Sequence, residues 1–311
     1  MSSPYIHAYH GLTFVIHIPG ILLQENLFDK VLMDIALMRA IGIKPVLVLG
    51  PSAQIERRLS ELGIKSTVKN GLRITDAHTL QIIKEAAGSM RFEVEGVLAR
   101  GVINIPSSTR VSLVSGSFYS AKPVGIINGT DYGYTGKVRR IDSEGINRRL
   151  DEGDIIVIPN VGFSPSGQLF NCQSEEVAGE CAAQLKAAKL IFLSGSDVIY
   201  DSRTGHPIPN MTIDVAQQFL SSYGSELPFD FRLPLEQSLF ALQRGVLRTH
   251  ILNRFINGVL LMEVFHRDGV GLMISRDIYE GIRPAEVKDV MGMMEIINPL
   301  MEEGMYCHPF Q

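Results

Sequence analysis

The chain has 311 residues, of which 45% are hydrophobic and 20% charged, and its formal net charge is −4. That composition is typical of a globular protein with one large or two moderate domains. Because the chain has no Lys/Arg-rich cluster and no apolar run long enough to cross a bilayer, we expect neither a nucleic-acid partner nor a membrane span.

Apolar strands and amphipathic helices alternate along the first half of the chain. Thr75 or Asp76 is placed to cap a helix. Two runs, 111–115 and 118–126, surround Gly116 and are predicted to pair as a hairpin. The other elements predicted here are strands at 14–18 and 46–49, a helix from about 28 to 41 and a helix through Ile55, Leu59 and Leu62.

The second half continues the alternation, with short apolar runs that suit buried strands of a parallel sheet. Ser174 is placed to cap a helix, and 224–234 resembles a linker. This order predicts a three-layer α/β/α sandwich with a mainly parallel central sheet. A new strand–helix pattern begins after Gly281, so we expect a main domain over 1–281 and a second over 282–311. The strands predicted in this half are 155–159, 189–195 and 249–253.

Residues 46–55, VLVLGPSAQI, have the form of a phosphate-binding turn between a strand and a helix. Such turns hold anions with free backbone N–H groups at the helix N-terminus, and they need glycine for close approach. Here Pro51 removes one N–H donor, and Ser52 and Ala53 carry side chains. The sequence therefore predicts a kept fold with eroded phosphate chemistry.

Further segments share their order with a known family. They are FVIHIPG, GLRITDAHTL, KEAAGSMRFEVE, VSGSFYSAKPVGIINGTDYGYTGKVRRID, LFNCQSEEVAGECAAQLKAAKLIFLSG and HILN followed by LLMEVFHRDGVGLMIS. With VLVLGPSAQI, they make the chain resemble the amino-acid kinase domain of bacterial- and plant-type N-acetylglutamate synthase, a relative of N-acetylglutamate kinase. The resemblance runs from about Tyr5 to Gly304.

The resemblance implies a carbamate kinase-like fold and an enzyme of two domains. In the family, one domain binds arginine as an inhibitor, and a small acetyltransferase domain moves acetyl from acetyl-CoA to glutamate. Residues 282–304 resemble the first strand and helix of that second domain, and no glycine-rich CoA turn follows before Gln311. The resemblance thus implies an incomplete acetyltransferase domain, no cofactor held by this chain, and a homo-oligomer.

The resemblance also locates a kinase-type cleft. The kinases place one lysine at the position of His17 and another near Pro234, and neither position is a lysine here. The matched positions are His17, Gly20, Gly50, Arg73, Gln173 and Glu175. Since phosphoryl transfer needs such cations, we expect no catalytic residue and a vestigial cleft.

Ordinary structural roles are open for the same residues. His17 could be a strand histidine with a local hydrogen bond, and Glu175 could be a helix N-terminal charge. In the kinases, the counterpart of Arg73 binds the carboxylate of the acylated amino acid. Arg73 could do the same for a small acid, or it could pair with Asp76.

The best functional candidate lies in 250–275. Arginine-sensitive relatives bind the effector through positions that match His250, Glu263, Gly269 and Ser275. Glu263 could take the guanidinium by two parallel bonds, and Ser275 with backbone N–H groups could hold the α-carboxylate. Alternatively, Glu263 is a surface charge beside Arg267, His250 is a core histidine, and Gly269 is a turn glycine.

We interpret the chain as mainly the arginine-binding regulatory domain of an N-acetylglutamate synthase-type protein. One alternative is a working amino-acid N-acetyltransferase, if the tail is completed, and another is an amino-acid kinase. Three cysteines without a C-x-x-C pair, and no H-E-x-x-H motif, indicate neither a disulfide framework nor a metal site. With no Lys or Arg before Lys30, we expect a cytoplasmic protein, or alternatively one of the plastid stroma.

Overall fold

A computed structural model describes residues 8–103, 112–195, 208–265, 269–276, 290 and 293–294. The chain divides into two compact units, Met1–Asp277 and Ile278–Gln311. The predicted boundary at Gly281 and nearly all of the predicted 282–311 segment lie outside the described residues, so that division stays a prediction. All that follows concerns the first unit.

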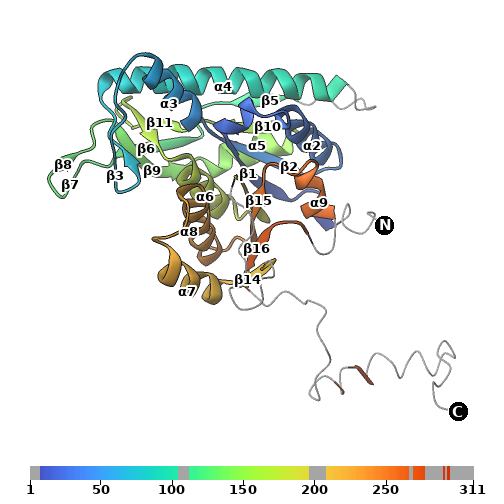
Figure 1. Cartoon of the computed structure of the whole chain (residues 1–311). Coiled ribbons are helices and arrows are strands. Elements are labelled where there is room, and N and C mark those ends of the chain that lie inside the picture. The colour runs from blue at the N-terminus through green and yellow to red at the C-terminus, as the bar shows by residue number, and fades with distance from the viewer. Residues whose placement is uncertain are drawn as a thin grey trace, which may run out of the picture. The chain divides into compact units, whose positions relative to one another are not determined.

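An eight-stranded sheet forms the middle layer of this unit (Figure 1). Its order is β14-β16-β15-β13-β1-β2-β10-β5, and all neighbours run parallel except β15 and β16, which are antiparallel. The strands are β1 (Thr13–Pro19), β2 (Lys44–Gly50), β5 (Leu113–Ser115), β10 (Ile155–Ile158), β13 (Lys189–Ser194), β14 (Asn210–Thr212), β15 (Arg248–Asn253) and β16 (Leu272–Ser275).

Helices cover both faces of the sheet. Successive strand residues point to opposite faces, so Phe14 and Ile16 join one core and Val15 joins the other. The first core is closed by α2 (Phe28–Ala40), α4 (Ala77–Ile103) and α9 (Val259–Phe265), and the second by α5 (Ser143–Asp151), α6 (Ser174–Leu185) and α8 (Phe229–Gln243). The predicted three-layer α/β/α sandwich with a mainly parallel sheet is confirmed.

Smaller elements surround this sandwich. A closed four-stranded barrel, β11-β12-β9-β6, consists of β6 (Tyr119–Pro123), β9 (Thr135–Ile141), β11 (Val161–Phe163) and β12 (Leu169–Cys172). The others are η1 (Gly20–Gln24), α3 (Ser52–Glu61), α7 (Ile213–Tyr223), and the strand pairs β3 (Val68–Lys69) with β4 (Leu72–Arg73) and β7 (Ile126–Ile127) with β8 (Thr130–Asp131).

Two predictions about local structure are wrong. The runs beside Gly116 do not pair with each other, because β5 joins β10 in the central sheet while β6 pairs with β9 in the barrel. The expected linker at 224–234 ends where α8 begins at Phe229, and Pro234 lies inside that helix. The cap of α4 is Asp76, whose Oδ1 accepts from the N–H of Thr79 at 2.7 Å.

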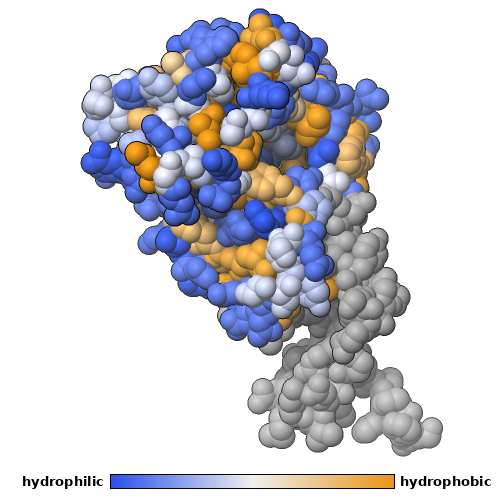
Figure 2. Space-filling view, turned by 60° about the vertical axis from the view of Figure 1, so that its left-hand side comes forward, coloured by the Kyte–Doolittle hydropathy of each residue, from blue (hydrophilic) through white to orange (hydrophobic). Residues whose placement is uncertain are grey.

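The surface mixes apolar and polar residues. On the face drawn in Figure 2, hydrophobic residues gather in several patches among hydrophilic ones. Exposed large hydrophobic side chains include Phe92, Ile126 and Leu247. Scattered apolar residues are normal on soluble surfaces and identify no partner. The predicted homo-oligomer therefore stays a prediction. In the described part of the chain, no helix is long and apolar enough to span a membrane.

Candidate functional site

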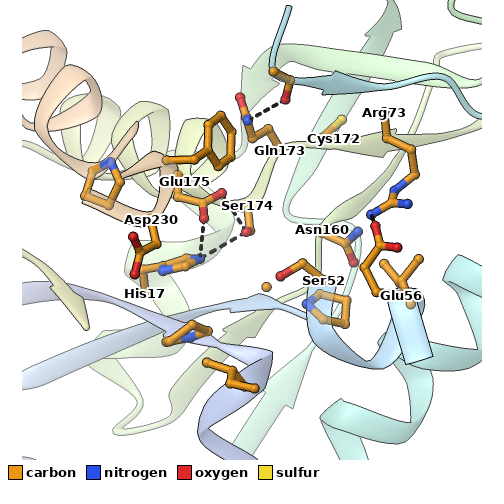
Figure 3. Close-up of a pocket in the computed structure, with 18 of the residues that line it drawn as sticks. His17, Ser52, Glu56, Arg73, Asn160, Cys172, Gln173, Ser174, Glu175 and Asp230 are labelled. Atoms are coloured by element: carbon orange, nitrogen blue, oxygen red, sulfur yellow. Dashed lines mark hydrogen bonds and ion pairs between the residues drawn. The ribbon is translucent and has the colours of Figure 1, made fainter. Parts of the chain in front are cut away.

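The predicted cleft residues meet at the carboxyl edge of the central sheet, where ligand crevices of open α/β sheets usually lie. A cleft of about 660 Å³ opens there beside the ends of β1, β2 and β13. Its lining includes five of the six predicted positions, namely His17, Gly50, Arg73, Gln173 and Glu175. Figure 3 shows His17, Ser174 and Glu175 drawn together on one wall and Arg73 with Glu56 on another.

His17 is buried and hydrogen-bonded within the cleft wall. Its Nε2 lies 3.0 Å from Ser174 Oγ and 3.8 Å from Glu175 Oε1. Burial lowers the pKa of His17 and outweighs the opposing effect of Glu175, so the imidazole is neutral at pH 7. Ser174 and Glu175 both lie nearest to Nε2 of His17. In a catalytic triad the acid instead binds Nδ1, so this arrangement is not a triad.

The two predicted glycines, Gly50 in the cleft lining and Gly20 outside it, both lie against protein side chains. A Cβ at Gly50 would lie 2.6 Å from Ser174 Oγ and 2.8 Å from His17 Nε2. At Gly20, the neighbouring group is the Gln54 side chain, whose Nε2 donates to the Gly20 carbonyl at 2.6 Å. Both glycines thus permit close packing against protein side chains, and Pro51 opens α3 without an N–H.

Arg73 lies in the cleft but does not pair with Asp76, so that alternative is wrong. Its Nη2 donates to Glu56 Oε1 at 2.6 Å, and its Nη1 donates to Ser66 Oγ. The Arg73 side chain is 12% exposed, whereas that of Glu56 is 51% exposed. Exposed carboxylates pair weakly because water screens them, so Glu56 is a displaceable partner of Arg73.

The charges of the cleft do not suit phosphoryl transfer. Among the described residues that line it, the cations are Arg73, Arg232 and Arg254, and none is a lysine. Arg254 is bound to Glu25 at 2.7 Å, and Arg232 lies 3.4 Å from Glu236. Pro234, near the expected second lysine, lines the cleft from within α8.

A second cluster lies towards the opposite edge of the sheet and on the face covered by α9. His250 Nδ1 lies 2.6 Å from Glu263 Oε1, and Lys189 Nζ lies 3.0 Å from His250 Nε2. All three residues are buried. Lysine can only donate, so Nε2 is the accepting nitrogen and Nδ1–H donates to the carboxylate. We call Lys189, His250 and Glu263 the Glu263 cluster.

The Glu263 carboxylate stays ionised although it is buried. Burial alone would raise the pKa of Glu263, but hydrogen bonds from His250, Val270 and Gly271 outweigh it and lower that pKa to about 2. Burial, with Lys189 nearby, lowers the pKa of His250 to about 4. Burial also lowers the pKa of Lys189 to about 8. At pH 7 the cluster therefore holds a carboxylate, a neutral imidazole and an ammonium.

Gly269 opens the turn that closes over this carboxylate. The N–H groups of Val270 and Gly271 donate to Glu263 Oε2 at 2.6 and 3.1 Å. Gly269 has φ +60, and a Cβ there would lie 2.6 Å from the same oxygen. The group that approaches Gly269 so closely is the Glu263 side chain. The alternative of Glu263 as a surface charge is wrong, and Arg267 lies outside the described residues.

Ser275 lies on the same sheet face as His250. In the antiparallel register, His250 is opposite Met273 and Arg248 is opposite Ser275, and opposite residues share a face. The structure thus brings the predicted positions His250, Glu263 and Gly269 into contact, with Ser275 one step along the same face. It keeps all four apart from the cleft, which lies at the other ends of the strands.

Sequence reasoning missed Lys189, because a lysine at the start of an apolar strand usually lies exposed to solvent. The available signal was the parallel pairing of KLIFLS with RTHILN, which places Lys189 beside Arg248 and His250. It also missed the buried polar side chain Asn160 on the cleft wall. In the described part of the chain, no group of three or more His, Cys, Asp or Glu side chains is placed to hold a metal ion.

Comparison with known proteins identifies the class of fold first. The profile of the amino acid kinase family matches residues 13–253. Carbamate kinase from Giardia shares the fold with a TM-score of 0.61 at 12% identity, over 86% of this chain and 99% of that one. Fold and cleft together define a protein of the amino acid kinase class.

More similar relatives narrow this class. The amino-acid acetyltransferases of Shewanella oneidensis and Ectopseudomonas mendocina are 37% and 36% identical over 98% of this chain and 69% and 70% of their own. N-acetylglutamate synthase from Neisseria gonorrhoeae, complexed with coenzyme A and L-arginine, has a TM-score of 0.82 at 31% identity, over 100% of this chain and 71% of that one. This chain belongs to the N-acetylglutamate synthase family of amino-acid acetyltransferases.

The buried imidazole makes stability depend on pH. The folded-state pKa of His250, about 4, lies below the ordinary pKa of 6.5 for histidine, so between these values the unfolded chain binds the extra proton. Stability should therefore fall as pH falls from 6.5 to 4, by a contribution on the order of 1–3 kcal/mol. Urea unfolding across this range should show a shallower dependence for His250→Gln. The exposed His78→Gln is the control, and an equally shallow curve for it would contradict the assignment.

Proposed function

We propose that this chain senses L-arginine at the Glu263 cluster and, within an N-acetylglutamate synthase-type protein, links its binding to acetyl transfer from acetyl-CoA to glutamate. The observation that carries the proposal is a buried carboxylate that accepts hydrogen bonds from His250 and from the backbone N–H groups of Val270 and Gly271. A buried carboxylate is the group that best recognises a guanidinium. The relative from Neisseria gonorrhoeae, bound to coenzyme A and L-arginine, supports the same ligand.

The contacts of Glu263 limit how arginine binds. An ionised carboxylate has about four acceptor positions. His250, Val270 and Gly271 use three of them. A single charge-assisted bond from the guanidinium fits the remaining position on Oε1. The two parallel bonds expected from sequence would require one of these three donors to leave.

This competition offers a route for regulation. The Glu263 side chain is only 4% exposed, so a ligand reaches it only when the packing around it opens, and two parallel bonds would in addition displace a donor such as the turn at 269–271. Arginine would then favour the conformation with that turn opened, and unequal affinity for two conformations is the requirement for coupling. The turn joins α9 to β16, and α9 packs against α2 on the same face of the sheet. A shift of the turn would therefore be passed to α2.

Lys189 completes the proposed effector set. Its ammonium lies 5.3 Å from the centre of the Tyr9 ring and 3.0 Å from His250. When the guanidinium of the ligand arginine binds the Glu263 carboxylate, the α-carboxylate of the same ligand needs a cation of the protein, and the Lys189 ammonium can supply it. We assign that role to Lys189 with Ser275, and the guanidinium end to Glu263.

Arginine should stabilise the fold selectively. At about 100 times its dissociation constant, a ligand that binds only the folded state adds roughly 2.7 kcal/mol. L-Arginine should raise the melting temperature in a concentration-dependent way. L-Lysine, which lacks the planar fork, and L-citrulline, which lacks the charge, should do much less. Equal responses to all three ligands would remove the arginine assignment.

Glu263→Gln should weaken arginine binding by roughly 1.5–3 kcal/mol, the usual range for a hydrogen bond to a charged group. Glutamine is nearly isosteric and can still accept from the turn, so the variant should fold. Glu175→Gln, in the cleft at the other edge of the sheet, is the matched control and should leave the affinity unchanged. Calorimetry that gives the two folded variants the same affinity would mean that Glu263 only holds the turn.

ATP with N-acetyl-L-glutamate should give no acyl phosphate. The described lining of the cleft has no lysine to neutralise a transferring phosphoryl group, and His17 is neutral. His17→Lys alone should not restore the reaction, because Pro51 still removes a donor from the second turn. Hydroxamate formed from the wild-type chain above a no-protein blank would instead support the kinase alternative.

A further inference from the structure

A short loop, 254–258, connects two of the elements that carry the Glu263 cluster. It leads from the end of β15, the strand of His250, into α9, the helix of Glu263. Arg254 begins the loop, and its backbone N–H donates to the carbonyl of Ser194 at the end of β13, at 3.0 Å. Any movement of α9 therefore has to be taken up by this loop.

An ion pair fixes the side chain with which the loop begins. Arg254 Nε donates to Glu25 Oε1 at 2.7 Å, and the two side chains are 13% and 17% exposed. The guanidinium also lies over the Phe255 ring, 4.5 Å from its centre, and a Cβ at Gly195 would collide with it. Because water has little access to either side chain, this pair is screened less than a surface pair.

Glu25 lies between η1 and α2 and is itself held in place. Its N–H donates to the Leu22 carbonyl at 3.0 Å, and its carbonyl accepts from the N–H of Phe28, the first residue of α2, at 3.2 Å. α2 packs against α9 in the first core, which the loop also joins through the partly buried Ile256 (Figure 1). The ion pair thus fastens the loop that leads into α9 to the beginning of the helix against which α9 packs.

The ion pair is only partly satisfied. In the described part of the chain, Glu25 Oε2 is buried and has no hydrogen-bond partner. The attraction within a buried ion pair repays the desolvation of its charges only when the remaining lone pairs are also satisfied. Opening the pair would bring Oε2 into water, and this gain offsets part of the lost attraction. The paired and opened arrangements therefore differ less in free energy than those of a fully hydrogen-bonded pair.

We propose that the Glu25–Arg254 ion pair is a latch that holds α9 in place and thereby keeps Glu263 covered. Glu263 is only 4% exposed, so a ligand reaches it only in the arrangement with the latch open. When the binding-competent state is a minor one, the apparent affinity is reduced by the population of that state. The closed latch therefore lowers the affinity for L-arginine. This effect on affinity rests on the proposed arginine sensing, whereas the effect of the latch on the opening of the turn at 269–271 does not.

Hydrogen exchange of the whole chain without any ligand tests the latch first. The amides of Val270 and Gly271 donate to Glu263 Oε2, so they exchange when this region opens. Glu25→Gln removes the charge but keeps an oxygen that can accept from the guanidinium. It should speed the exchange of both amides about tenfold, which corresponds to about 1.4 kcal/mol, and leave that of Ile16 inside β1 unchanged. Equal acceleration at Ile16, or no acceleration at either turn amide, overturns the proposal.

Asp29→Asn is the matched control. Asp29 also lies at the start of α2 and accepts from Arg100 Nη2 at 3.2 Å, but that pair connects α2 to α4, and its side chains are 56% and 66% exposed. The control should leave the exchange of the turn unchanged, and acceleration equal to that of Glu25→Gln overturns the proposal. Arg254→Gln breaks the latch from its other side and should reproduce the Glu25→Gln result, so the test stands if one of the two variants does not fold.

Calorimetry with L-arginine then tests what the latch does to binding. The factor by which Glu25→Gln strengthens binding should equal the factor by which it speeds exchange, because both follow the population of the open arrangement. A variant that is only less stable would not bind more tightly. Unchanged or weaker binding by a variant with faster exchange overturns the role of the latch in sensing. No binding of L-arginine to the wild-type chain would instead remove the proposed function, and exchange alone would then decide whether the latch exists.

Discussion

Burial of the central sheet on both faces limits the polar chemistry that its strands can carry. The five interior residues of β1 are all buried, and so are all four residues of β10 and all six of β13. A polar side chain in such a strand must find a partner from a neighbouring element, because no water reaches it. His17 finds Ser174 from α6, whereas Lys189 and His250 find each other and Glu263 from α9.

The Glu263 cluster shows how such a charge is kept. Desolvation opposes the carboxylate, yet three donors within hydrogen-bond distance lower its pKa to about 2. Two of these donors are backbone N–H groups, so the carboxylate also determines the course of the chain between α9 and β16. A glycine is required at 269, where φ is +60 and the carboxylate occupies the place of a Cβ. Charge, turn and strand pairing therefore support one another.

The sequence predicts the layers of the fold because apolar runs of a parallel sheet are short and dense in β-branched residues. It predicts His250, Glu263 and Gly269 as a group only through the family resemblance. The pairing of strands is harder to predict from sequence than the periodicity within one strand. The run after Gly116 therefore resembles the second strand of a hairpin, although it belongs to a different sheet. Lys189 and Asn160 are missed for a related reason. Their partners lie 61 and 11 positions away, and no local pattern reports a contact made by the fold.

The cleft and the Glu263 cluster use opposite ends of the same strands. β13 carries Lys189 at its first position and Ser194 at its last, and β15 carries His250 while Arg254 follows it. The described residues that line the cleft do not include Lys189, His250 or Glu263. A scaffold of this kind can give up one chemistry and keep another, since no side chain in the described part of the chain belongs to both sites. It can also be edited in the laboratory one end at a time, with the untouched end as an internal reference.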